Sequence, residues 1–420
     1  MRKVHLARAV TPADSALELT AHWGREQVCA AAQRGTSAYA QRDSTSTTGR
    51  DRMRMHATRT VTAVVAICSM LANPVNACTG LTLRAQDGAV IFGRTLEWGS
   101  FDLHSRLVIV PRGHAFKSLT PDGAAGRTWT ASYGAVGLDA VEKDFIVDGM
   151  NEKGLAVNVF YHPGYAEYPA YDASKALNTI SSLDVAQYLL TTSATVDEVR
   201  KAIAGVRVVG VVEPAIGVAP PIHLMVTEPS GKAIVIEFAK GDVQIYDAPL
   251  GVITNSPTYD WHVTNLRNYI NLSPVALPSK KIEDLNFAPL GGGSGMIGLP
   301  GDFTPPSRFV RAVAFAKTAR PTASGDETMY EVFRILDNFN VPLGAAEGEG
   351  ASRIKGLRSA TLWTTAYDTK NLVMQYHTMH NRRVRQVDLK QIDFAAQKQM
   401  VRLPLDREKS QDVLDVTPRR

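Results

Sequence analysis

The stretch from Cys78 to Trp98, CTGLTLRAQDGAVIFGRTLEW, predicts a β-hairpin that begins on a cysteine. Residues 79–85 alternate in polarity, Gln86-Asp87-Gly88 supplies a turn, and residues 89–96 form the returning strand. The cysteine is therefore expected as the first residue of a sheet, with no flexible tether after it.

The 25 residues before this cysteine, 53–77, read MRMHATRTVTAVVAICSMLANPVNA and have the three parts of a secretory signal. A short basic start precedes an apolar run, 61–71, that is too short to span a bilayer. The helix-breaking Pro74 follows, and Val75 and Ala77 place small residues where a signal peptidase reads them. We therefore expect cleavage after Ala77. The alternative is a buried core helix, for which this order would be accidental.

Residues 1–52 contain few aromatics and a polar run, GTSAYAQRDSTSTTGRDR, without sustained periodicity. Because a signal peptide should begin a chain, we interpret this segment as a disordered upstream extension, with translation starting at Met53 or Met55. An unusual targeting arm is the alternative. The expected mature protein is residues 78–420, in which no linker separates two domains.

The residues before the predicted cleavage site account for the whole net charge of +5. Ten of the 46 Lys and Arg residues and five of the 41 Asp and Glu residues precede Cys78, which leaves 36 of each sign in residues 78–420. The composition of the mature chain therefore gives no reason to expect a nucleic-acid partner. The signal instead predicts an exported protein, located in the periplasm, and no segment is long enough to predict a membrane span.

Of the three cysteines, Cys29, Cys68 and Cys78, only Cys78 remains after the predicted cleavage. Cysteines in an oxidising compartment are normally paired, and this one has no intramolecular partner. A cysteine directly after a signal is either the acylated residue of a lipid-anchored binding protein or the nucleophile of an N-terminal hydrolase. Asn76 fits badly before a lipid anchor, and the hairpin leaves no tether, so we favour the nucleophile.

The chemistry of an N-terminal cysteine also favours the nucleophile. An α-amino group has a pKa near 7.7–8.0 and a thiol near 8.5, so a substantial neutral fraction of the amine can accept the thiol proton at physiological pH. No separate catalytic histidine is required. The base lies on the same residue as the nucleophile and is exposed by the cut after Ala77.

The rest of the chain alternates between strand-like and helix-like segments. Predicted strands are 106–110, 128–133, 144–148, 155–161, 222–227, 233–238, 243–247, 251–255, 361–367 and 372–378. Predicted helices are 184–190, 195–205, 261–270, 306–319 and 327–338. This pattern predicts a layered α+β architecture.

Four motifs resemble, in order and spacing, those of the choloylglycine hydrolase and penicillin V acylase family. They are residues 78–98, quoted above, MNEKGLAVNVFYHPGYA (150–166), VITNSPTYDWHVTNLRNY (252–269) and LPGDFTPPSRFVRA (299–312). The resemblance covers essentially all of residues 78–420. It implies a four-layer αββα sandwich of the N-terminal nucleophile hydrolase type, acting on linear amides, and is compatible with a homotetramer.

By this resemblance, the family's nucleophile matches Cys78 and its arginine near the active site matches Arg94. The family's carboxylate near the N-terminal amine, usually aspartate, matches Glu97, which is one methylene longer. Arg94 can lower the pKa of the thiol, and Glu97 can accept a hydrogen bond from the α-ammonium group or an arginine.

The remaining matched residues concern the oxyanion. The family's oxyanion-hole asparagine matches Asn255, and the variable residue that also contributes to the hole matches Tyr161. Arg308 matches the arginine of the SRFVR motif and can help order the thiolate and amine. A side-chain amide such as Asn255, paired with a backbone N–H, stabilises the charge that attack builds on the carbonyl oxygen.

The sequence predicts neither a metal nor a cofactor. His377 and His380, three residues apart on a predicted strand, point in different directions, and no carboxylate or cysteine completes a site. The expected partner is a small N-acyl amide, whose acyl pocket the aromatic residues can line: Trp98, Phe101, Phe160, Tyr161 and Tyr165. The resemblance favours choloylglycine (conjugated bile salt) hydrolase, ahead of penicillin V acylase and an acylase of acyl-homoserine lactones.

Overall fold

The computed structural model describes residues 78–99, 102–346 and 360–418, which lie within one compact unit of residues 69–420. The predicted extension, 1–52, and the predicted signal, 53–77, lie outside the described residues, as does Phe101. Within the described part of the chain, no helix combines the length and hydrophobicity needed to cross a bilayer.

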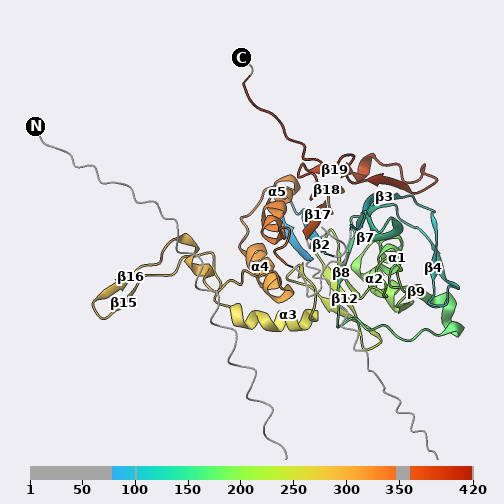
Figure 1. Cartoon of the computed structure of the whole chain (residues 1–420), viewed down its shortest axis with the longest axis horizontal. Coiled ribbons are helices and arrows are strands. Elements are labelled where there is room, and N and C mark those ends of the chain that lie inside the picture. The colour runs from blue at the N-terminus through green and yellow to red at the C-terminus, as the bar shows by residue number, and fades with distance from the viewer. Residues whose placement is uncertain (1–77, 100–101, 347–359, 419–420) are drawn as a thin grey trace, which may run out of the picture. The chain divides into compact units, whose positions relative to one another are not determined.

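Two large antiparallel sheets form the centre of the fold (Figure 1). In the order of its strands, the six-stranded sheet contains β14 (Val252–Ile253), β1 (Thr79–Arg84), β2 (Val90–Trp98), β17 (Ala360–Asp368), β18 (Val373–Thr378) and β19 (Arg385–Asp388). The eight-stranded sheet contains β13 (Asp242–Asp247), β12 (Ala233–Ala239), β11 (Ile222–Thr227), β8 (Ala156–Tyr161), β7 (Lys143–Asn151), β6 (Ala135–Ala140), β3 (Arg106–Val110) and β20 (Val401–Pro404).

Three two-stranded ribbons accompany the large sheets. They pair β4 (Ala115–Leu119) with β5 (Ala125–Thr130), β9 (Thr179–Ser181) with β10 (Arg207–Val209), and β15 (Lys280–Ile282) with β16 (Leu285–Phe287).

Helices cover the outer faces of both sheets. On the six-stranded sheet, α4 (Pro305–Thr318) contacts β1, and α5 (Gly325–Leu336) contacts β2 and β17. On the eight-stranded sheet, α1 (Val185–Thr192) contacts β7 and β8, with α2 (Val196–Ala204) beside it. Figure 1 shows the orange and green helix pairs on either side of the strands. This arrangement confirms the predicted four-layer αββα sandwich.

The predicted hairpin is confirmed, since β1 and β2 pair in an antiparallel register from Thr79 opposite Thr95 to Arg84 opposite Val90. Several predicted boundaries were wrong, among them the strand 251–255, of which only Val252–Ile253 is formed. The strand predicted at 128–133 begins at Ala125, because that residue pairs with Leu119 across the β4–β5 ribbon. The helix predicted at 261–270 is α3, Tyr259–Asn265, and continues only as a 3₁₀ turn.

The two large sheets approach each other closely at Gly80, two residues after the hairpin's first residue. A Cβ atom on Gly80 would lie 2.8 Å from Cζ of Phe160 in β8 and 3.0 Å from Cγ2 of Ile253 in β14. Both neighbours are fully buried, so neither ring nor methyl group has free space to move into. The absence of a side chain at Gly80 therefore sets the spacing of the sheets near Cys78.

Replacing Gly80 by alanine is expected to lower the free energy of unfolding by about 1–3 kcal/mol, the usual result of overpacking a core. Gly301→Ala is the control, because a Cβ atom there meets nothing within 4 Å. Urea unfolding of both variants checks this prediction. Equal midpoints for Gly80→Ala and Gly301→Ala would show that the sheets are not in tight contact.

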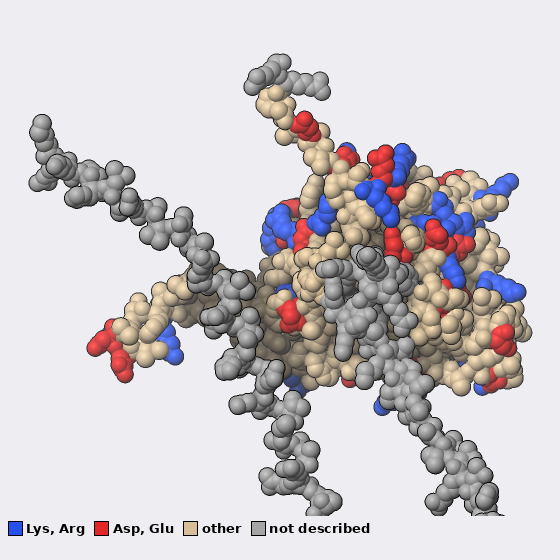
Figure 2. Space-filling view, viewed as in Figure 1, with Lys and Arg blue, Asp and Glu red and all other residues tan. Residues whose placement is uncertain are grey.

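Charges of both signs are intermixed on the face of the molecule drawn in Figure 2, where Lys and Arg side chains lie among Asp and Glu side chains. This agrees with the equal numbers of the two signs in residues 78–420.

Candidate active site

Cys78 lies immediately before β1 and is 4% exposed. In the full-length chain its nitrogen belongs to the peptide bond with Ala77, and this N–H donates a hydrogen bond to Oδ1 of Asn255 at 2.9 Å. The carbonyl oxygen of Cys78 accepts a hydrogen bond from Nη1 of Arg308. The backbone of Cys78 is thus held on both sides by Asn255, just after β14, and by Arg308 in α4.

Arg308, in the first turn of α4, connects most of these groups. Its Nη1 donates to Oγ1 of Thr79 at 2.9 Å, its Nη2 to Oδ1 of Asn255 at 2.8 Å, and its Nε to the carbonyl oxygen of Phe303 at 2.8 Å. Burial lowers the pKa of Arg308 to about 10, so the guanidinium remains charged at neutral pH. The structure therefore places a buried positive charge beside Cys78.

Asn255 follows the short strand β14 and joins Cys78 to the end of β8. While its Oδ1 accepts from Cys78 and Arg308, its Nδ2 donates to the carbonyl oxygen of Tyr161 at 2.7 Å. A primary amide has two N–H groups, so one donor of Asn255 remains for a bound substrate. The hydrogen bonds fix the orientation of this donor.

Arg94, in β2, is fully buried and lies between two aromatic rings. Its guanidinium carbon is 4.3 Å from the ring centre of Phe160 and 5.2 Å from that of Trp363. Its Nε donates to the carbonyl oxygen of Thr95 at 3.2 Å, and its Nη1 donates to that of Val159. These contacts hold the charge at a fixed place between the sheets.

The surroundings of the Cys78 thiol act on its pKa in opposite directions. Burial raises this pKa, while the positive charges of Arg94 and Arg308 and a hydrogen bond from the backbone N–H of Glu97 lower it. Burial is the largest of these effects, and the pKa is above its ordinary value. In the uncleaved chain the thiol is therefore protonated at neutral pH, and a nearby base is required to form the thiolate.

Glu97, three residues after Arg94, is fully buried, and its Oε1 accepts a hydrogen bond from Oγ1 of Thr361 at 2.7 Å. Burial raises the pKa of Glu97 to about 7, although Arg308 and Thr361 both oppose the shift. Glu97 was predicted to accept a hydrogen bond from the nitrogen of Cys78 or from an arginine. In the uncleaved chain its carboxyl accepts from Thr361 in β17 instead, and the N–H of Cys78 donates to Asn255.

Glu97→Gln is expected to weaken the dependence of stability on pH. Glu97 keeps its proton up to about pH 7 in the folded chain, compared with an ordinary value of 4.5. The folded state thus binds more protons between these values, and its stability falls as the pH rises through them, by on the order of 3 kcal/mol. Urea unfolding at about pH 5 and pH 8 measures this fall. An equal fall in the wild type and in Glu97→Gln would contradict the assignment.

A cavity of about 80 Å³ lies beside Cys78. Its lining is mostly apolar and includes Leu96, Trp98, Leu103, Ala140, Val141, Phe145, Tyr161, Ile216 and Pro220. Trp98 and Tyr161, two of the aromatic residues predicted to line the pocket, do line it and pack edge to face with ring centres 5.6 Å apart. Of the other aromatics predicted there, Phe160 lies under Arg94 in the core, and Tyr165 is 45% exposed.

A buried cluster lies behind the candidate site, formed by His162, His223 and Glu237. These side chains offer one ligand atom each within 4.8 Å of one another, which is close enough for a metal ion. Nε2 of His223 lies 3.0 Å from the carbonyl oxygen of Thr254, so Nδ1 faces Oε1 of Glu237 at 3.4 Å without its own proton.

Burial raises the pKa of Glu237 and lowers those of His223 to about 3 and His162 to about 2. Oε1 of Glu237 also accepts a hydrogen bond from the backbone N–H of Tyr259 at 2.8 Å, which fixes the carboxyl beside His223. Because His162 and Thr254 are direct chain neighbours of Tyr161 and Asn255, the cluster supports both of these residues from behind.

The structure therefore brings all six residues singled out in the sequence to one place. Cys78, Arg94, Glu97 and Tyr161 border the same cavity, and Asn255 and Arg308 are hydrogen-bonded to Cys78. They come from four places in the chain, residues 78–97, 161, 255 and 308, each more than fifty residues from the next.

Residues 78–402 match the family model described as linear amide C-N hydrolases, choloylglycine hydrolase family. Among curated relatives, a bile salt hydrolase/transferase of Clostridium perfringens is 31% identical over 315 residues, which cover 74% of this chain and 92% of that protein. A penicillin V acylase of Pectobacterium atrosepticum is 28% identical over 327 residues, covering 73% of this chain and 78% of that protein.

Among solved structures, a mutant of the conjugated bile acid hydrolase from Clostridium perfringens superposes with a TM-score of 0.70. The two chains are 28% identical, and the match covers 81% of this chain and 100% of that one.

Proposed function

Because the chain belongs to the choloylglycine hydrolase family of linear amide C–N hydrolases, we propose that it hydrolyses conjugated bile salts and releases glycine or taurine from the steroid acid. The observation that supports this most strongly is the position of Cys78, which lies at the wall of an apolar cavity and is hydrogen-bonded to Asn255 and Arg308. The apolar lining suits the hydrocarbon face of a steroid.

In the proposed reaction, cleavage after Ala77 turns the nitrogen of Cys78 into a free α-amino group. This amine accepts the thiol proton, Sγ attacks the carbonyl carbon of the substrate, and a tetrahedral oxyanion forms. The C–N bond then breaks, and the leaving amine takes the proton from the α-ammonium group. Water hydrolyses the resulting thioester, releases the acid and restores the thiol.

The oxyanion is assigned to the side-chain amide of Asn255, just after β14. Asn255 has one N–H that is not used by Tyr161, and its Oδ1 is placed to hold the α-amino group of Cys78. Arg94 and Arg308 stabilise the thiolate by their charge. Because the pKa of Glu97 lies near 7, this carboxyl gains or loses its proton near neutral pH and so changes the net charge of the buried region around Cys78.

Penicillin V is the second candidate substrate. The cavity of about 80 Å³ is small, and the aromatic rings of Trp98, Phe145 and Tyr161 suit the phenoxy group of penicillin V. The relative from Pectobacterium atrosepticum, a penicillin V acylase, is in keeping with this alternative.

A direct comparison of glycocholate and penicillin V tests the proposal. We expect purified wild-type enzyme to release glycine from glycocholate with a higher kcat/KM than it releases the amine product from penicillin V. Enzyme whose thiol has been alkylated is the control for background hydrolysis. A preference for penicillin V would favour the second candidate, and hydrolysis of neither would refute both.

We also propose that the protein is exported and cleaved after Ala77, and that it acts in the periplasm. The three-part signal in residues 53–77 supports this, as does the family match that starts at residue 78. Fractionation of an expressing Gram-negative host, with a cytoplasmic marker as control, tests the location. Activity only in the cytoplasmic fraction would contradict it.

A homotetramer, the assembly compatible with the family resemblance, is proposed for the mature enzyme. The β15–β16 ribbon supports it, because Ile282, Leu285 and Phe287 are all at least half exposed and would gain burial at a subunit contact. Light scattering after size-exclusion chromatography distinguishes a tetramer from a monomer.

A further inference from the structure

The cavity beside Cys78 is bordered by two turns that are far apart in the sequence. The first, called here the β6–β7 turn, spans residues 140–145 and contributes Ala140, Val141 and Phe145 to the lining. The second, called the 213–220 turn, contributes Ile216 and Pro220. The separation of these turns sets the width of the acyl pocket.

The β6–β7 turn has a backbone that is held in place by its surroundings. Val141 and Glu142 have φ values of 53° and 54°, in the left-handed region that β-branched residues such as valine avoid. Such a conformation persists only where neighbouring contacts enforce it. One such contact is the hydrogen bond from the N–H of Val141 to the carbonyl oxygen of Leu103, at 2.6 Å.

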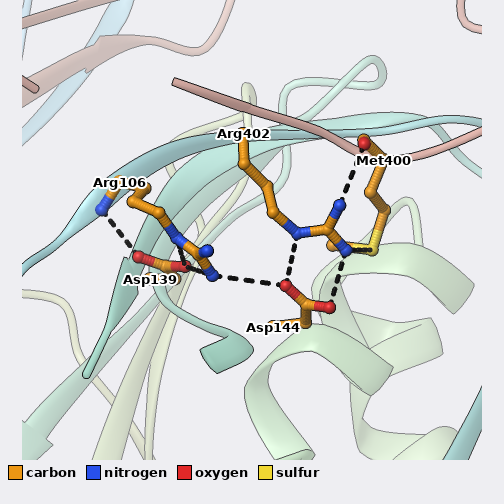
Figure 3. Close-up of polar contacts among 5 residues, drawn as sticks. All are labelled: Arg106, Asp139, Asp144, Met400 and Arg402. Carbon is orange, nitrogen blue, oxygen red and sulfur yellow. Dashed lines mark hydrogen bonds and ion pairs between the residues drawn. The ribbon is translucent and has the colours of Figure 1, made fainter. Parts of the chain in front are cut away.

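Ion pairs on both sides of the β6–β7 turn supply further contacts (Figure 3). Asp139, just before the turn, accepts from Nε of Arg106 at 2.8 Å, and Asp144, near the end of the turn, accepts from Nε and Nη2 of Arg402 at 2.5 and 2.6 Å. Arg106 also reaches Asp144 at 3.3 Å. The strands β3 and β20 therefore anchor this side of the pocket.

The 213–220 turn is folded around Glu213. The carbonyl oxygen of Glu213 accepts from the N–H groups of Ile216 and Gly217, its N–H donates to Val218, and its Oε1 accepts from the N–H of Ala215 at 3.1 Å. Because these bonds join Glu213 to the backbone of Ile216, the two residues move together. Oε2 of Glu213 is left for a partner outside the turn.

That partner is Lys143, on the β6–β7 turn. Its Nζ lies 2.9 Å from Oε2 of Glu213, whose side chain is only 3% exposed. A buried carboxylate without a counter-charge is strongly disfavoured, so loss of Lys143 would drive Glu213, and Ile216 with it, toward solvent. The Lys143–Glu213 ion pair thus connects the two sides of the pocket.

We propose that the Lys143–Glu213 ion pair is a specificity determinant that limits the width of the acyl group reaching Cys78. The cavity measures about 80 Å³, whereas pockets for drug-sized ligands measure roughly 300–1,000 Å³. A wide acyl group must therefore separate the two turns, and the ion pair opposes that separation. The identity of the acyl group rests on the proposed function, but the width of access to Cys78 does not.

Alkylation of Cys78, the single cysteine of residues 78–420, measures this width without a substrate. The ratio of the rate constants for a wide reagent, N-pyrenylmaleimide, and a narrow one, iodoacetamide, is expected to rise about threefold in Lys143→Ala and in Glu213→Gln, as loss of one partly buried ion pair allows. Lys143→Arg, which keeps the charge, should retain the wild-type ratio. The double variant Lys143→Ala/Glu213→Gln should not exceed either single variant.

Lys232→Ala is the control, because it removes an ion pair with Asp197, at 2.6 Å, in which neither partner lies on a turn that lines the cavity. In the substrate assay, kcat/KM for glycocholate relative to penicillin V should rise in Lys143→Ala and stay constant in Lys232→Ala. An unchanged alkylation ratio in folded Lys143→Ala and Glu213→Gln would overturn the proposal. A changed alkylation ratio without hydrolysis of either substrate would retain it and refute the proposed function instead.

Discussion

Cys78→Ser is expected to reduce amide hydrolysis by on the order of a thousandfold or more. The substitution keeps the size of the side chain, so the hydrogen bonds from Cys78 N–H to Asn255 and from Arg308 to the Cys78 carbonyl oxygen can remain. The loss is chemical, because a hydroxyl group is far less acidic than a thiol and a weaker nucleophile toward an amide carbonyl. Steady-state hydrolysis of glycocholate by the purified variant measures the effect.

Two checks separate this chemical loss from a failure to fold or to mature. The variant should unfold at the wild-type urea concentration, and its N-terminal sequence should begin at residue 78. Activity above about a tenth of the wild-type rate in a correctly cleaved Cys78→Ser enzyme would rule out the thiol as nucleophile.

Arg308→Met is expected to have the largest effect on stability, because each buried acceptor left without its donor costs about 1–3 kcal/mol. The methionine fills the apolar part of the space but leaves the carbonyl oxygens of Cys78 and Phe303 without their donor. It also removes the charge that opposes the raised pKa of Glu97. Because Asn255 loses its hydrogen bond from Nη2, the donor assigned to the oxyanion is less well oriented, and kcat falls as well.

Arg311→Met is the control for this prediction. Arg311 lies in the same helix, is 6% exposed and donates to the carbonyl oxygens of Pro300 and Asp302, but has no hydrogen bond to Cys78 or Asn255. The Arg311→Met variant should be less stable than the wild type but should hydrolyse glycocholate at the wild-type rate per titratable thiol. If Arg308→Met retained both wild-type stability and wild-type kcat, the central position assigned to Arg308 would be incorrect.

The sequence predicted the layered architecture because its local signals and the tertiary structure agree. The hairpin after Cys78 has alternation, a turn and a return strand within 21 residues, and β1 and β2 follow that pattern. The strand β6, Ala135–Ala140, was not predicted. Its sequence, AVGLDA, is short and mixed, and it is stabilised by pairing with β3 and β7 rather than by local propensity.

The site was predicted residue by residue, but its contacts were not. Glu97 is hydrogen-bonded to Thr361, which is 264 positions away in the sequence. A contact between residues so far apart cannot be predicted from a local sequence pattern. Asp148 was missed for the same reason. It is fully buried in β7 and accepts hydrogen bonds from Thr365 and Tyr367 in β17, both at 2.7 Å, and burial raises its pKa while the positive charge of Arg94 opposes that rise. Burial of this kind arises only when the sheets stack.

The pocket walls were predicted only in part. Aromatic content identified Trp98 and Tyr161, but Val141, Ile216 and Pro220 come from turns with no aromatic or catalytic signal. A positive φ at a valine is set by the contacts around the β6–β7 turn, not by the preference of the residue itself. Substrate width is therefore a property of the folded chain that residue types do not reveal.

Intact mass spectrometry of the active enzyme, quenched in acid during turnover of glycocholate, tests the mechanism most directly. We predict a chain that begins at Cys78 and, in a fraction of molecules, carries the mass of the acyl group on that residue. Fully active enzyme that retains residues before Cys78, or that carries the acyl group on another residue, would contradict a nucleophile whose base is its own freed amine.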